Sequence, residues 1–138
     1  MSAGNVGIVR KLFADFEAGD LGAVFSAFDE DIEWVEPYGY FAGAGGVRGV
    51  AAVEQVLAAY PKAWSEFALV PERFLDAGDD VVVTGVQRGV ALATGAPYRG
   101  RFCNVWTLAD GRVVRMEAFT DTAMMWKAFG GHPPGAAE

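Results

Sequence analysis

The sequence contains few of the residues that most often build metal and disulfide sites. Its 138 residues include one cysteine, Cys103, and one histidine, His132. A single cysteine cannot form an internal disulfide or a cysteine-rich metal cluster, and one histidine in a Gly/Pro-rich end argues against a histidine-bound catalytic metal. We therefore expect no metal and no cofactor, and the cysteine content is consistent with a reducing compartment.

Basic residues and long apolar runs are also scarce. Eleven lysines and arginines against eighteen aspartates and glutamates give a net charge of −7, which offers little attraction to nucleic acid or to an anionic membrane. The chain has no apolar run long enough to span a bilayer, and its start, MSAGNVGIVRKLF, lacks the pattern of a signal peptide. We expect a cytoplasmic protein that binds neither nucleic acid nor membrane.

Apolar side chains, in contrast, are abundant. Hydrophobic residues make up 52% of the chain and aromatic residues 13%, which at this length is enough to bury one core. We predict a single domain over residues 1–138. About 5–130 should be ordered, and the Gly/Pro-rich tail 131–138 should be disordered.

Apolar residues at helical spacing predict three helices in the first half of the chain. The first covers residues 6–18, the second begins at Asp20, and the third is closed by Pro61. Between the second and the third helix the apolar spacing changes to two, which is typical of a strand.

This short strand gives one carboxylate an unusual position. Ile32, Trp34 and Glu36 share one of its faces, and Pro37 ends it. The Gly-rich residues 38–49 that follow are predicted to form a loop or lid. The carboxylate of Glu36 therefore has two apolar neighbours on the same side of the strand.

The second half of the chain predicts an antiparallel meander followed by a last helix. Four strands are indicated at 66–75, 80–92, 98–109 and 112–120, separated by the hairpin-type turns DAGDD, ATGAP and LADGR. Gly85 and Gly89 are candidate bulges that would supply curvature. The fold class is α+β, with a curved sheet folded around the N-terminal helices.

Three segments carry a resemblance to a known superfamily: FADFEAGDLGAVFSAFDEDIEWVEP, VRGVAAVEQVL and VWTLADGRVVRMEAFTD. In this order and spacing the chain resembles the nuclear-transport-factor-two-like superfamily over residues 5–130, specifically its SnoaL-like and ketosteroid-isomerase-like branch. The resemblance implies a cone-shaped, cystatin-like α+β barrel with an antiparallel or mixed sheet, a deep apolar cavity and a homodimer. Reactions in this superfamily include double-bond isomerisation, aldol-type ring closure and epoxide hydrolysis, so the fold alone does not name an activity.

The resemblance also implies roles for individual residues. The base of the steroid isomerases precedes a proline at the end of the first strand, which corresponds to Glu36. Their oxyanion site uses a tyrosine and a neutral acid, whose positions hold Leu12 and Asn104 here, and the amide of Asn104 can still donate a hydrogen bond. In SnoaL-like polyketide cyclases, an aspartate between the last strand and helix acts as acid or base, and Asp121 holds that position.

Each of these polar residues has an alternative interpretation. Asp121 is also a favourable N-cap for the last helix, and strand alternation places it on the face opposite Met116, so a bulge or the strand end must turn it inward. Glu36 can instead be the last member of an acidic surface run. Asn104 can be a core amide satisfied by protein partners. The Arg-x-Asp pair of the epoxide hydrolases is missing, because no Asp or Glu occurs between residues 81 and 109.

Our leading hypothesis is a cofactor-independent cyclase or isomerase that acts on an apolar, carbonyl-containing small molecule such as a polyketide- or steroid-like compound. Asp121 would be the acid/base, Asn104 would stabilise an enolate oxygen, and Glu36 would be a second base or polariser. The alternatives are a non-catalytic small-molecule-binding or dimerisation module, and an epoxide hydrolase with a rearranged site. The side chains expected to line a substrate pocket are Trp34, Trp106, Phe102, Tyr60, Phe16, Met116 and Leu12. Plain core is the alternative for five of them, Trp34, Tyr60, Phe102, Trp106 and Met116.

Overall fold

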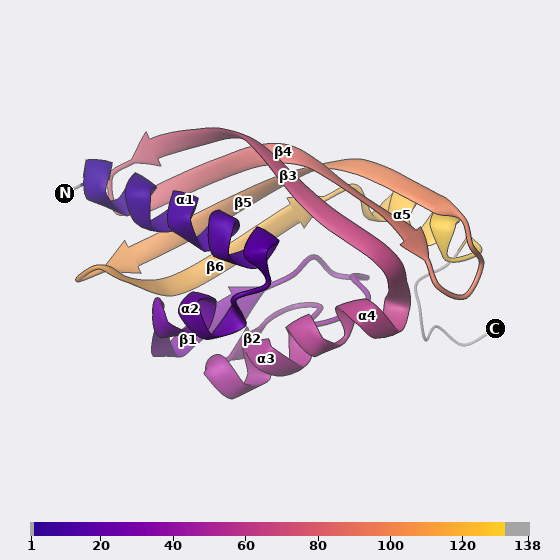
Figure 1. Cartoon of the computed structure of the whole chain (residues 1–138), viewed down its shortest axis with the longest axis horizontal. Helices are drawn as coiled ribbons and strands as arrows, with labels where there is room; N and C mark the ends of the chain where they lie inside the picture. Colours follow the sequence, from indigo (N-terminus) through magenta and orange to yellow (C-terminus); the bar gives the residue numbers. More distant parts are fainter. Residues whose placement is uncertain (1, 132–138) are drawn as a thin grey trace.

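The computed structural model describes residues 2–131, which form five helices and six strands (Figure 1). In chain order these are α1 (Ser2–Ala18), α2 (Leu21–Ser26), β1 (Phe28–Val35), β2 (Val47–Arg48), α3 (Val50–Ala58), α4 (Tyr60–Ala63), β3 (Trp64–Ala77), β4 (Asp80–Ala91), β5 (Pro97–Ala109), β6 (Arg112–Thr120) and α5 (Thr122–Ala128). The predicted disordered tail lies outside the described residues, apart from Gly131. No helix within residues 2–131 is both long and apolar enough to cross a membrane.

The six strands form one curved sheet that does not close into a barrel. Their order is β2-β1-β6-β5-β4-β3. β1 runs parallel to β6, and every other neighbouring pair is antiparallel, so the sheet is mixed. The long strands bend around α1, while α2 and α3 lie beside β1 and α4 leads directly into β3 (Figure 1). The predicted α+β class with a curved sheet around N-terminal helices is confirmed.

Two local features of the first half were not predicted. The Gly-rich loop contains the two-residue strand β2, which pairs with β1 through Glu33 and Arg48. Pro61 does not end a helix but lies in the first turn of α4. Backbone N–H groups in the first turn have no intrahelical acceptor, so a proline there costs no hydrogen bond. A short helix therefore follows α3 directly and carries Tyr60 into the interior.

The sheet bends through bulges in β3 rather than in β4. The β3–β4 register shifts between Pro71 and Arg73 and again between Trp64 and Glu66, whereas no shift interrupts the β4–β5 pairing. The predicted role of Gly85 and Gly89 as bulges is therefore wrong. These glycines instead let β3 come close, because a Cβ at Gly85 would lie 2.2 Å from the carbonyl oxygen of Val70.

A third register shift changes which side chains of β6 face inward. Leu108 pairs with Val113, but Thr107 pairs with Arg115, so Val114 is the extra residue. Val113 and Met116 are both buried as a result. Simple alternation places Val114 on the inner face, and the bulge at this position explains why Val113 takes its place.

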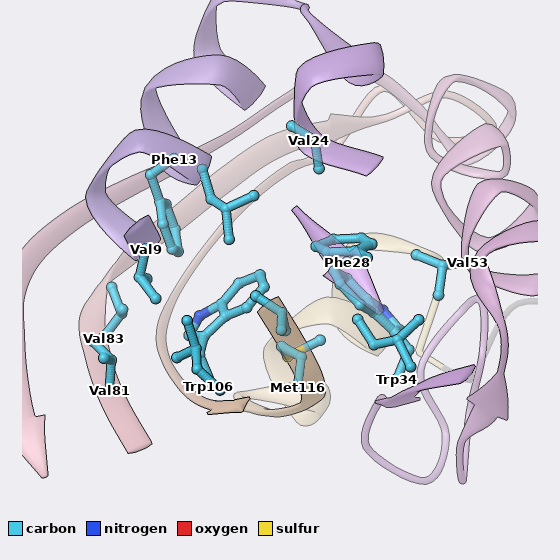
Figure 2. Packing of buried hydrophobic residues seen from close by; sticks show 14 of the residues in the cluster. Val9, Phe13, Val24, Phe28, Trp34, Val53, Val81, Val83, Trp106 and Met116 are labelled. Atoms are coloured by element: carbon cyan, nitrogen blue, oxygen red, sulfur yellow. The ribbon is translucent and has the colours of Figure 1, made fainter. Parts of the chain in front are cut away.

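The main core lies between the concave face of the sheet and the N-terminal helices. Figure 2 shows Val9 and Phe13 of α1 packing toward Trp106 and Met116, with Trp34 and Phe28 beside them. The aromatic rings pack largely edge to face, with centroids 5.7 Å apart for Trp34 and Trp106. Such packing excludes water from the space around the inner ends of these strands.

Candidate active site

A narrow chamber opens from this core toward α1 and α4. Its walls come from the concave face of the sheet, from Phe13 and Phe16 of α1 and from Tyr60 of α4. The free volume inside is about 40 Å³, room for one or two water molecules. Its wall is mainly aromatic and aliphatic, and its polar members are Glu36, Tyr40, Tyr60, Gln87, Asn104 and Thr120.

Glu36 is a buried carboxyl group in this chamber. Its side chain is 4% exposed, and the indole Nε1 of Trp34 donates a hydrogen bond to its Oε2 at 2.8 Å. Burial raises the pKa of Glu36 to about 8, although the hydrogen bond from Trp34 acts in the opposite direction. At neutral pH both the protonated and the ionised form are therefore populated.

The backbone around Glu36 fixes the inward orientation of its side chain. The strand alternation that buries Ile32 and Trp34 continues for one more residue, and Pro37 then stops further pairing. The amide of Gly45 donates to the carbonyl of Glu36 at 3.1 Å, and Glu36 forms an isolated bridge with Ala44. The Gly-rich loop thus folds back and holds the end of the strand.

Tyr40 is a site residue that the sequence analysis did not identify. Its hydroxyl lies 2.8 Å from the hydroxyl of Tyr60 in a hydrogen bond that either group can donate. Burial raises the pKa of both hydroxyls well above the usual value, and the nearby charge of Glu36 adds to this. Both tyrosines therefore stay neutral. Tyr40 follows the loop glycine Gly39, where no periodic pattern exists to reveal a buried position.

Asn104 and Gln87 are the two buried amides of the chamber. Asn104 is 7% exposed, and its side chain has no hydrogen-bond partner among the described residues, so its donors are available to a ligand. Gln87 Nε2 donates to the hydroxyl of Tyr98 at 2.8 Å and also to Thr120 Oγ1. Alternation along β4, which buries Val81 and Val83, could have identified Gln87 from the sequence.

Asp121 does not enter the chamber, and its predicted placement there is wrong. It is the exposed N-cap of α5, where its Oδ1 accepts a hydrogen bond from the amide of Met124 at 3.0 Å. β6 ends at Thr120 without a bulge near its end, so nothing turns the next side chain inward. Thr120 takes the last position of β6 that lines the chamber.

The structure places six of the seven predicted lining residues in the chamber wall: Phe16, Trp34, Tyr60, Phe102, Trp106 and Met116. Leu12 is the exception. It is 1% exposed and packs inside the core cluster instead of facing the chamber. The surface of α1 that lines the chamber is formed by Phe13, the neighbour of Leu12, and by Phe16, one turn further along the helix.

Comparisons with known proteins agree with this architecture. The crystal structure of an NTF2-like protein from Burkholderia pseudomallei superposes with a TM-score of 0.86 at 29% identity, covering 92% of this chain and 98% of that one. The structure of TerC, co-crystallised with polyporic acid, has a TM-score of 0.83 at 30% identity and covers 91% and 97% of the two chains. The protein YesE of Bacillus subtilis is 29% identical in an alignment of 126 residues that covers 89% of this chain and 85% of that protein.

The family comparison covers most of the domain that carries the chamber. The model of the SnoaL-like domain matches residues 9–116, from α1 into β6. This span includes Glu36, Gln87 and Asn104, and it ends at Met116 in the chamber wall. The chain therefore belongs to the SnoaL-like family.

Proposed function

We propose that this SnoaL-like protein is a cofactor-independent acid/base enzyme of the cyclase or isomerase type, with Glu36 as the group that moves the proton. The observation that carries the proposal is a carboxyl group buried among aromatic rings, with its pKa raised to about 8. A group of this pKa takes up and returns protons efficiently near neutral pH. The substrate class is an apolar small molecule with a carbonyl group, such as a polyketide- or steroid-like compound.

The proposed step is proton abstraction next to the carbonyl. The carboxylate of Glu36 accepts the proton, and the electron pair of the broken C–H bond forms a carbon–carbon double bond while the carbonyl oxygen gains the negative charge. The free amide of Asn104 donates a hydrogen bond to that oxygen. Protonated Glu36 then returns the proton to a different carbon. In the ring-closing case, the enolate carbon instead bonds to a second carbonyl carbon, the π electrons of that carbonyl move to its oxygen, and this oxygen takes the proton from Glu36 to give a hydroxyl group.

The TerC comparison supports a small-molecule ligand for this fold. TerC shares 30% identity with the chain, and its structure was determined with polyporic acid. Asp121 has no part in the proposal, because it is the exposed N-cap of α5 and does not line the chamber. A two-carboxylate epoxide hydrolase site also lacks support, since Glu36 is the one carboxyl group that lines the chamber within residues 2–131.

Deuterium exchange tests the proposal without knowledge of the natural substrate. The protein is incubated in heavy water with a panel of apolar ketones, and mass spectrometry measures deuterium gained beside the carbonyl. We expect enzyme-dependent labelling that Glu36→Gln abolishes and Asp121→Asn leaves intact. Labelling that survives in Glu36→Gln would contradict the assigned base.

The same experiment separates the enzyme from a non-catalytic binding module. Polyporic acid serves as a second probe, and its affinity is measured by titration calorimetry. A binding module would hold polyporic acid or a ketone and return it without deuterium, whereas the proposed enzyme exchanges the ketone. Binding without exchange across the whole panel would favour the module.

A further inference from the structure

A second, larger hollow lies directly outside the chamber. It runs between the C-terminal half of α1 and residues 67–71 of the edge strand β3, and its volume is about 650 Å³. That volume falls in the range of small-molecule pockets, roughly 300–1,000 Å³, whereas the inner chamber offers about 40 Å³. We call this outer hollow the α1–β3 groove. The chamber holds the reactive groups, but the groove has the room for a ligand.

The chamber and the groove share part of their walls. Phe13, Phe16, Tyr60 and Leu69 line both spaces. These four side chains therefore form the partition between the buried carboxyl group and the outside. A molecule that reaches Glu36 from the groove must pass them.

The four residues of the partition differ in how firmly they are held. Phe13 is 7% exposed, and its ring packs against those of Phe74, Phe102 and Trp106. Tyr60 is fixed by its hydroxyl bond to Tyr40.

Phe16 and Leu69 are less constrained than the other two. Both are half-buried, and Phe16 makes no ring pairing with any other aromatic side chain in the described part of the chain. Close-packed side chains resist displacement, while half-buried ones change rotamer at low cost. Phe16 and Leu69 are thus the side chains able to move aside.

We propose that the chamber and the α1–β3 groove are two parts of one binding site, separated at rest by Phe16 and Leu69. The ligand that fits is an elongated apolar ketone, whose carbonyl end reaches Glu36 and whose tail lies in the groove. This inference rests on the proposed function for the role of Glu36. It adds that the substrate is extended rather than compact, because the groove provides most of the volume.

The chemistry of the groove agrees with an apolar tail. Phe67, Leu69, Val70 and Pro71 line the β3 side, and charged groups occur only as Glu17 and Arg88 among its lining residues. Each methylene group transferred from water to such a surface raises affinity about fourfold. A tail of several carbons should therefore increase affinity by at least tenfold.

Two methyl ketones of different length test the inference. Butanone has almost no tail to place in the groove, whereas undecan-2-one has a long tail that extends into it. We expect kcat/KM for deuterium exchange to be at least tenfold higher for undecan-2-one. Ala68→Trp places a large ring in the groove and should remove the advantage of undecan-2-one over butanone.

A matched variant controls for the added ring. Ala77 lies at the far end of the same strand and does not line the groove, so Ala77→Trp should keep the preference for the long ketone. Equal kcat/KM for the two ketones in the unmodified protein would overturn the inference. An unchanged preference in Ala68→Trp would overturn it as well.

Direct binding measurements keep the inference distinct from the proposed chemistry. Calorimetric affinity for undecan-2-one should be similar in the unmodified protein and in Glu36→Gln, and at least tenfold weaker in Ala68→Trp. If neither ketone exchanges deuterium but this binding pattern holds, Glu36 is not the base, and the groove is still the binding site for the ligand tail. If exchange occurs but Ala68→Trp binds normally, the proposed base stands and the groove is wrong.

Discussion

At the scale of single residues, Trp34 and Trp106 provide a matched pair for the electrostatics of Glu36. The indole of Trp34 donates to the carboxylate, whereas the indole nitrogen of Trp106 has no hydrogen-bond partner among the described residues. A donor stabilises the ionised carboxylate and lowers its pKa. Trp34→Phe should therefore raise the pKa of Glu36 further, by about one unit.

The pKa of Glu36 can be followed by nuclear magnetic resonance of its side-chain carboxyl carbon, with Glu36→Gln used to assign the signal. Trp106→Phe removes the same volume of ring next to the chamber as Trp34→Phe does, but it removes no hydrogen bond. It should therefore leave the titration midpoint of Glu36 unchanged. Equal midpoints in the unmodified protein and in Trp34→Phe would show that the bond has no effect on the proton affinity.

Asp121 is expected to stabilise the fold without contributing to turnover. Its side chain satisfies the amide of Met124 at the start of α5, and loss of such a cap costs about 1 kcal/mol. Asp121→Ala should lower the free energy of unfolding by this amount in urea denaturation, while Asp121→Asn, which can still accept the bond, should lower it less. Loss of ketone exchange in Asp121→Ala at unchanged stability would contradict this role.

Residue-level prediction from the sequence succeeded where strand alternation applies. Ile32, Trp34 and Glu36 point inward as their spacing of two predicts, and Asn104 lies between Phe102 and Trp106 in the same way. The placement of Asp121 in the chamber came from the family resemblance and failed, whereas strand alternation had put this residue on the opposite face, which agrees with its exposed cap position. Prediction also failed at Leu12 because a buried helix stripe does not reveal whether it faces packed core or open chamber.

At the scale of elements, Gly85 permits the close contact between β3 and β4. A Cβ at this position would lie 2.2 Å from the carbonyl oxygen of Val70, so Gly85→Ala forces the backbones of the two strands apart. We expect a loss of about 3 kcal/mol in the free energy of unfolding, measured by urea denaturation.

Gly7 provides the matched control for the same chemical change. A Cβ at Gly7 meets nothing within 4 Å, and the residue lies inside α1, where alanine is favoured over glycine. Gly7→Ala should therefore stabilise the protein by about 0.5–1 kcal/mol. Similar effects of the two substitutions would show that the predicted clash at Gly85 does not occur.

Prediction of the elements was accurate for the long, regular segments and failed at local interruptions. The order of helices and strands followed from the change in apolar spacing, and the hairpin turns followed from Asp-Gly and Gly-rich sequences. The bulges in β3 and β6, the short strand β2 and the separate helix α4 were missed. Each depends on contacts with a partner strand or loop, and such contacts leave no periodic pattern in the chain itself.

At the scale of the whole molecule, Glu36 should couple stability to pH. Burial raises the pKa of Glu36 from its ordinary value of 4.5 to about 8 in the folded protein, so between these two pH values the folded state binds more protons than the unfolded state. The stabilising contribution is complete below pH 4.5 and is lost as pH rises through 8. The full loss corresponds to roughly 5 kcal/mol.

Comparison with Glu36→Gln isolates this contribution from all other titrating groups. The melting temperature of the glutamine variant should exceed that of the unmodified protein by an amount that grows from pH 5 to pH 8 and then levels off. A constant difference across this range would mean that Glu36 titrates with an ordinary pKa. The homodimer implied by the family resemblance stays a prediction, which sedimentation analysis can test.

The contact between Trp126 and Gly39 links the last helix to the Gly-rich loop that follows β1. The indole Nε1 of Trp126 in α5 donates to the carbonyl of Gly39 at 2.9 Å, and a Cβ on Gly39 would lie 2.4 Å from the indole ring. The next residue, Tyr40, lines the chamber, so the last helix helps to hold the chamber wall in position although no residue of that helix lines the chamber. Substitutions at positions 39 and 126 should thus be epistatic, and engineered changes of ligand preference can be sought in α5, remote from the reacting atoms.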